Sequence, residues 1–176
     1  MAVLKGSMSH TEVGLAGEFY VLAQLAHRGF IGTLTLSDTK GIDILVANQS
    51  LNRLYKVEVK TTQKPPWNES LFGSTAQYMW PMSLKHETLR APNLFYVFVH
   101  LGKANERPRF FIVPSKAVAK YVRWQHQHWL STRKNPVKET PMRKFRIPIN
   151  DPDGYEDNWA VFSRRAESRK TTRKRV

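Results

Sequence analysis

The spacing of apolar positions divides the first part of the chain into one helix and three strands. Apolar side chains recur at helical spacing through residues 12–29, with Ser9 or Thr11 placed to cap the start and Gly29 to end the helix. Short apolar runs separated by turn-forming residues then predict three strands, at residues 30–36, 42–47 and 53–60.

A change of composition separates these elements from the rest of the chain. Residues 63–82 are rich in proline, glycine and aromatic side chains, which predicts an excursion over the surface that faces a substrate. The pattern then predicts a short helix, two strands, a second helix and two short final segments, at residues 83–90, 93–101, 108–113, 115–130, 145–149 and 158–162. This order of elements is typical of a layered α/β domain.

The third predicted strand carries two opposite charges on one face. Glu58 and Lys60 are two residues apart, and residues at that spacing project to the same side of a strand. Upstream, Asp43 interrupts the apolar run of the second strand. If these two strands pair through the loop at residues 48–52, Asp43 approaches Glu58 at the end of the hairpin.

Two carboxylates beside a lysine suggest a cation site. A buried carboxylate is disfavoured unless it is paired or bound to a metal. Carboxylate oxygens suit a hard divalent cation such as Mg²⁺, and a lysine can position an attacking water. The alternatives are a surface salt bridge between Glu58 and Lys60 on an edge strand, and a turn role for Asp43.

The residues GID at 41–43 and VEVKTT at 57–62 resemble the signature of the PD-(D/E)xK nuclease superfamily. That signature has an acid at the start of one strand and E-x-K on the next, and Ile42 stands where the pattern nominally has proline. Gly and Glu at 17–18 on the first helix resemble the Holliday-junction-resolvase-like branch. The resemblance covers residues 12–113.

The resemblance implies a fold, an activity and a set of roles. The fold would be a restriction-endonuclease-like α/β domain, with a mixed central sheet of about five strands flanked by helices. The chain would be a Mg²⁺-dependent endonuclease that hydrolyses DNA phosphodiester bonds, with Mn²⁺ as a substitute. Asp43, Glu58 and the carbonyl of Val59 would bind the metal, Glu18 would be an accessory ligand, and Lys60 would position the water.

The charge of the chain indicates a polyanionic partner. Lysine and arginine number 28 against 14 aspartates and glutamates, which gives a net charge of +14. Nucleic acid, here duplex or branched DNA, is the commonest such partner. Residues 163–176 hold seven basic residues and one acid, so they predict a disordered basic arm after a single nuclease-like domain at residues 1–162. A merely solubilising tail is the alternative.

Several polar and basic side chains are candidates for contacts with DNA, either after the third strand or in the loop at residues 131–142. They are Gln63, Lys64, Arg133, Lys134, Lys138, Arg143 and Lys144. A solvated loop is the alternative for the later group.

Aromatic and histidine side chains leave further questions open. The aromatics of the excursion, Trp67, Phe72, Tyr78 and Trp80, either stack on bases or cover a face of the sheet. His126 and His128 fall on different sides of the predicted helix, so they are not expected to share a metal ion.

The remaining composition narrows the class of protein. The chain has no cysteine, which excludes disulfides and thiolate-bound zinc. Because the chain has no long apolar run and no signal-peptide pattern, we expect a soluble cytoplasmic protein. A homodimer is a further expectation, since duplex DNA offers two strands to cut. Two other functions stay open: a non-catalytic nucleic-acid-binding module on the same fold, or an interaction protein that uses its basic tail.

Overall fold

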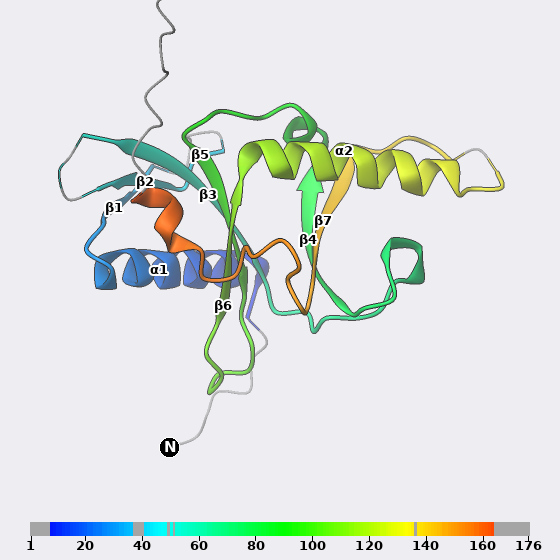
Figure 1. Ribbon diagram of the computed structural model, residues 1–176. Helices are drawn as coiled ribbons and strands as arrows, with labels where there is room; N and C mark the ends of the chain where they lie inside the picture. Colours follow the sequence, from blue (N-terminus) through cyan, green and yellow to red (C-terminus); the bar gives the residue numbers. More distant parts are fainter. Residues whose placement is uncertain (1–7, 37–40, 49, 51, 136, 164–176) are drawn as a thin grey trace, which may run out of the picture.

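A five-stranded sheet forms the centre of the molecule, with a helix on either side and a second sheet beside it (Figure 1). The computed structural model describes residues 8–36, 41–48, 50, 52–135 and 137–163. Of the helices in these ranges, none has a stretch whose length and hydropathy would suit a bilayer crossing.

The first helix forms close to where the apolar spacing predicts it. Helix α1 spans His10–His27, and a capping box between Ser9 and Glu12 satisfies backbone groups at its start. The helix ends as the chain enters Gly29, whose φ of 76° is readily adopted only without a side chain.

The central sheet is mixed, which confirms the expected fold class. It contains the strands β1 (Ile31–Leu34), β2 (Ile44–Ala47), β3 (Leu54–Thr62), β5 (Leu94–His100) and β6 (Arg109–Pro114). Their order across the sheet is β1-β2-β3-β5-β6. Strands β3 and β5 are parallel and the other neighbours are antiparallel, so β3 lies in the middle with a partner on each side.

Alternate residues of β5 separate two hydrophobic cores. Phe95, Val97 and Val99 pack in the core that includes α1 side chains. Tyr96 and Phe98 face the other way, into the core built with α2 (Ser115–Ser131) and the second sheet. The helices therefore cover opposite faces of the sheet, and β5 is buried on both sides.

The prediction that residues 63–82 form a surface excursion is wrong for their second half. Strand β4 (Gln77–Ser83) pairs antiparallel with β7 (Met142–Pro148) to make the two-stranded sheet. Tyr78 and Trp80 are buried there, and the Trp80 indole donates a hydrogen bond of 2.9 Å to the Val99 carbonyl. Covering the sheet face, rather than stacking on bases, is therefore what these two aromatics do.

Three single turns complete the described structure. They are the 3-10 turns η1 (Ser70–Phe72), η2 (Leu84–Glu87) and η3 (Trp159–Phe162). The short helix expected at residues 83–90 is thus the four-residue turn η2. It directly follows β4, which is how a residue of this turn comes to face the central sheet.

Candidate active site

The antiparallel pairing of β2 and β3 brings Asp43 and Glu58 together. Ile44 pairs with Val57, and the Asp43 amide donates a hydrogen bond of 2.8 Å to the Val57 carbonyl, so Asp43 stands opposite Glu58. Ile44 and Val57 project into the core under α1. Both carboxylates therefore project from the opposite face of the sheet. This confirms the proximity predicted from the hairpin, and the central place of β3 excludes the edge-strand alternative.

Asp43 is anchored on the neighbouring strand. Its Oδ2 accepts a hydrogen bond of 2.6 Å from the Val59 amide. Burial raises the pKa of the Asp43 carboxyl, although the Val59 hydrogen bond and the charge of Lys60 oppose that rise. The hydrogen bond thus holds the Asp43 carboxyl in place. A positive charge in addition to that of Lys60 would favour its ionised form.

Glu58 is almost completely buried, with 1% of its surface exposed, and its two oxygens differ. Oε1 lies 2.8 Å from Lys60 Nζ and 3.0 Å from His86 Nε2. Oε2 makes no hydrogen bond within the described part of the chain. Burial opposes ionisation, but the hydrogen bonds from His86 and Lys60 and the Lys60 charge outweigh it and lower the pKa of Glu58 to about 2. Oε2 thus has no ordinary hydrogen bond within the described residues, and the buried Tyr96 hydroxyl, also without a partner there, is close enough that burial and the Glu58 carboxylate raise the pKa of Tyr96.

Gly41 keeps space open beside Glu58 Oε2. A Cβ at this position would lie 3.3 Å from Glu58 Oε2. The residue also has a φ of 72°, which most side chains disfavour. The glycine of the GID motif therefore brings bare backbone close to the second carboxylate oxygen.

A close contact between α1 and β3 places Glu18 at the same site. Gly17 is buried against Thr61, where a Cβ would lie only 1.9 Å from the Thr61 Oγ1. The next residue, Glu18, lines a surface cleft together with Asp43. Burial and the Asp43 charge raise the pKa of Glu18, while Lys60 opposes the change. The structure thus brings Glu18 into electrostatic contact with the acid and the lysine of the hairpin.

Two further residues of the site come from η2, and reasoning from the sequence did not identify them. His86 is 3% exposed and hydrogen-bonded to Glu58, and Lys85 Nζ lies 3.8 Å from Glu58 Oε1. They lie in a segment predicted only as a short helix. The position of η2 depends on β4, a strand of the second sheet. No spacing along the chain therefore relates Lys85 and His86 to the E-x-K strand.

The donor set of the site is small. Within the ranges that the structure describes, no group of three or more acidic or histidine side chains could hold a metal ion by itself. What the site offers is a pair of carboxylates, Asp43 directly before β2 and Glu58 on the adjacent β3, with Glu18 nearby. Such a set suits a cation that takes its remaining ligands from water or phosphate, as Mg²⁺ commonly does.

The candidate DNA contacts lie in three different settings. Gln63 and Lys64 are exposed directly after β3, and Lys144 is partly buried on β7. Arg133, Lys134 and Lys138 are exposed beyond α2, and the Arg133 guanidinium lies 4.4 Å from the centre of the Trp129 ring.

Arg143 differs from the rest of this group. It is 2% exposed, and its guanidinium pairs with Glu87 and Glu139 and donates to the carbonyls of Thr140 and Met142. These donors are engaged within the protein, so Arg143 has a structural position rather than a place on a DNA-facing surface. Of the predicted basic arm at residues 163–176, all but Ser163 lies outside the described residues.

The remaining aromatic and histidine candidates do not converge on the site. Trp67 and Phe72 belong to the segment that connects β3 to β4 along the chain, and both are partly buried. On α2, His126 lies 3.9 Å from Glu139, whereas His128 Nε2 lies 3.1 Å from the Leu71 carbonyl. The two histidines thus have different partners within the protein.

Comparison with known proteins places the fold. No family model and no curated protein sequence matches the chain. Among solved structures, the bacterial homing endonuclease I-Ssp6803I is similar with a TM-score of 0.54 and 14% sequence identity, over 89% of this chain and 94% of that one. The Holliday junction resolvase Hjc of Archaeoglobus fulgidus aligns with a TM-score of 0.41 and 14% identity, over 81% and 86% of the two chains. With its mixed sheet, its flanking helices and this likeness to the homing endonuclease, the chain has the restriction-endonuclease-like fold.

Proposed function

We propose that the protein is a metal-dependent nuclease that hydrolyses phosphodiester bonds of DNA. The observation that carries this proposal is the Glu58 carboxylate, which is buried and ionised, with Oε1 hydrogen-bonded and Oε2 without a hydrogen-bond partner among the described residues. A buried polar atom is normally satisfied, so an open carboxylate oxygen beside a second carboxylate fits a bound cation.

Mg²⁺ is the cation that the donors fit best. Asp43 and Glu58 supply carboxylate oxygens from two paired strands, and Val59, between Glu58 and Lys60, would add its carbonyl oxygen. Glu18 would assist from α1. When bound, the metal lowers the pKa of a water and stabilises negative charge on the phosphate. Mn²⁺, which also prefers oxygen ligands, would substitute.

Lys60 would place the attacking water. Its ammonium group is held 2.8 Å from Glu58 Oε1, and 29% of its side chain is exposed, so it can contact both the buried acid and a substrate. In the reaction the water oxygen bonds to phosphorus and gives up a proton to solvent, one ester P–O bond breaks, and the leaving oxygen takes a proton from solvent. Lys60 donates hydrogen bonds to the water or to the phosphate throughout, and Lys85 adds positive charge on the same side.

DNA is the proposed substrate. The net charge of +14 favours a polyanion, and exposed basic side chains follow both β3 and α2. The similar structure is named as a homing endonuclease, which supports the same substrate class. We also propose that residues 1–162 form one domain, that residues 163–176 form a basic arm, and that the protein acts as a homodimer, because duplex DNA offers two strands to cut.

Plasmid cleavage tests the proposal. Supercoiled DNA is incubated with the protein in Mg²⁺, in Mn²⁺ and in EDTA, in parallel with Lys60→Ala and Asp43→Asn. Lys56→Ala is the matched control, because Lys56 is an exposed lysine of the same strand, whereas the lysines that pair with Glu58 are Lys60 and Lys85. We expect nicked or linear product that requires metal, persists in the control and is lost in the two site variants.

The contrary result has a definite meaning. Binding of DNA without cleavage in either metal, on plasmid and on branched duplexes alike, would favour the non-catalytic binding module. Cleavage that survives Lys60→Ala and Asp43→Asn would show that the active site lies elsewhere. Light scattering of the protein with and without duplex DNA tests the homodimer.

A further inference from the structure

We propose that His86 is a positioning residue that fixes the Glu58 carboxylate, so that Oε1 is held by the protein and Oε2 is presented to the cation. This inference rests on the proposed function and adds to it a residue outside the D…E-x-K pattern. His86 would not touch the metal or the phosphate. It would act through Glu58.

The hydrogen bond between the two residues has a definite direction. Glu58 Oε1 lies 2.8 Å from the Lys60 ammonium group, which can only donate, so Oε1 accepts hydrogen bonds. His86 Nε2 lies 3.0 Å from Oε1 and must therefore carry the hydrogen. On the other side of the ring, the Ser83 backbone amide donates to Nδ1 at 2.9 Å, and the Ser83 hydroxyl lies 3.0 Å from the same nitrogen. The Ser83 carbonyl also lies 3.0 Å from Nδ1, so the Ser83 contacts hold this nitrogen in place without fixing whether it carries a hydrogen, and the direction of the bond to Oε1 follows from Glu58.

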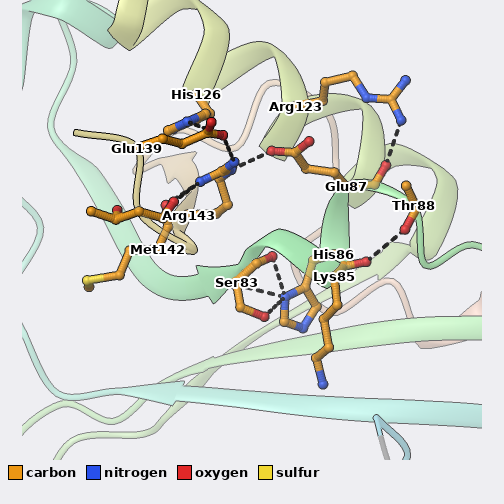
Figure 2. A network of polar contacts seen from close by, with 11 residues as sticks. Ser83, Lys85, His86, Glu87, Thr88, Arg123, His126, Glu139, Met142 and Arg143 are labelled. Carbon is orange, nitrogen blue, oxygen red and sulfur yellow. Dashed lines mark hydrogen bonds and ion pairs between the residues drawn. The ribbon is translucent and has the colours of Figure 1, made fainter. Parts of the chain in front are cut away.

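The second sheet holds this histidine rigidly in place. Figure 2 shows Ser83, where β4 ends, and Glu87, where η2 ends, on either side of His86. Glu87 forms an ion pair with the buried Arg143 of β7, and Arg143 also donates to the carbonyl of Thr140. These contacts anchor both ends of the turn and so restrict movement of the ring.

Lys60 alone cannot provide the same restraint. Its side chain is long, flexible and partly exposed, and in the proposed reaction it must also serve the water or phosphate. His86 is 3% exposed, and its ring is packed 5.8 Å from that of Tyr96. Loss of the histidine would leave Oε1 with only the more exposed ammonium groups of Lys60 and Lys85 as partners, so the carboxylate would be held less firmly. Loss of such an outer partner of a metal ligand typically weakens metal binding by about 10- to 100-fold.

Manganese binding in the absence of DNA tests the inference. Free Mn²⁺ is measured by electron paramagnetic resonance during titration of the wild-type protein, His86→Ala, His86→Gln and His128→Ala. We expect a weakening of about 10- to 100-fold in His86→Ala. Partial recovery is expected in His86→Gln, whose side-chain amide can donate to Oε1. His128→Ala is the matched control, since His128 is also hydrogen-bonded but lies on α2 against Leu71.

A second measurement separates positioning from direct ligation and from simple unfolding. Correlation of the ring nitrogens with their protons by NMR, on wild-type protein with Mg²⁺, should show a proton on Nε2 of His86. A ring nitrogen that binds the ion carries no proton. Absence of the Nε2 proton would therefore overturn the positioning role. This measurement uses the wild-type protein, so it decides the question even where the variants fail to fold.

The two proposals fail in different ways. A wild-type protein that neither binds Mn²⁺ nor cuts DNA would overturn the proposed function and this inference with it. A wild-type protein that binds and cuts, together with folded His86→Ala and His86→Gln variants of unchanged Mn²⁺ affinity, would overturn the role of His86 alone.

Discussion

Replacing Glu58 by glutamine should remove a specific part of the dependence of stability on pH. The carboxyl has a pKa lowered to about 2 in the folded protein, from an ordinary value of 4.5. Glutamine keeps an oxygen that can accept the His86 and Lys60 hydrogen bonds, but it does not ionise. The difference in free energy of unfolding between wild type and Glu58→Gln therefore isolates the charge on Glu58.

The sign and size of the effect follow from the two pKa values. A depressed folded-state pKa contributes stability above the unfolded-state pKa, and this is lost as the pH falls towards the folded-state pKa. At about 1.4 kcal/mol for each pKa unit, the full contribution is about 3 kcal/mol. With values of 4.5 and about 2, about 2 kcal/mol of it is lost between pH 5 and pH 3.

Denaturant unfolding at several pH values measures this difference. We expect the wild-type advantage over Glu58→Gln to shrink by about 2 kcal/mol between pH 5 and pH 3. Glu18→Gln is the matched control from the same site. The pKa of Glu18 is raised, so the wild type should gain stability relative to Glu18→Gln as the pH falls. A flat difference for Glu58→Gln would refute the argument that Glu58 is a buried, stabilised carboxylate.

Three further predictions concern the elements that hold the site. Gly17→Ala should destabilise the fold by about 1–3 kcal/mol in denaturant unfolding, because its Cβ would collide with Thr61, whereas Gly14→Ala, with open space around it, should be neutral or stabilising by up to about 1 kcal/mol. Calorimetry should show that Arg143→Met costs about 3 kcal/mol, because Glu87 loses its buried partner and the Thr140 and Met142 carbonyls lose their donor, and that Arg107→Met in an exposed pair costs less than about 1 kcal/mol. In the Glu18→Gln protein, metal-dependent cleavage should fall, because Glu18 faces the charges of Asp43 and Lys60, and unchanged cleavage would contradict an assisting role for Glu18.

Local pattern accounts for the elements that the sequence predicted correctly. The helix of residues 12–29 and the strands of the central sheet have side-chain spacings that reveal one buried face or a short apolar run. Strand β4 lacks such a signal, because Gln77 to Trp80 are all buried and nothing alternates. Its proline and aromatics indicated a loop until the pairing with β7 supplied the missing partner.

The core of the site could be predicted for the same local reason. Glu58 and Lys60 share a face because of the strand period, and a short loop brings Asp43 opposite them. The differing settings of Arg143 and Arg133 could not be predicted in this way. Both are arginines near the same basic loop, but the first meets Glu87 across the second sheet and the second stays exposed.

The sequence by itself determined the hairpin with its acids and lysine, because neighbours along a chain have few ways to pair. Only the tertiary structure decided which oxygen of Glu58 is held. His86 lies 28 residues further along the chain and reaches Glu58 because η2 follows β4 onto the face of the central sheet. Contacts of that kind depend on where separate elements cross, and no periodicity within either segment specifies that crossing.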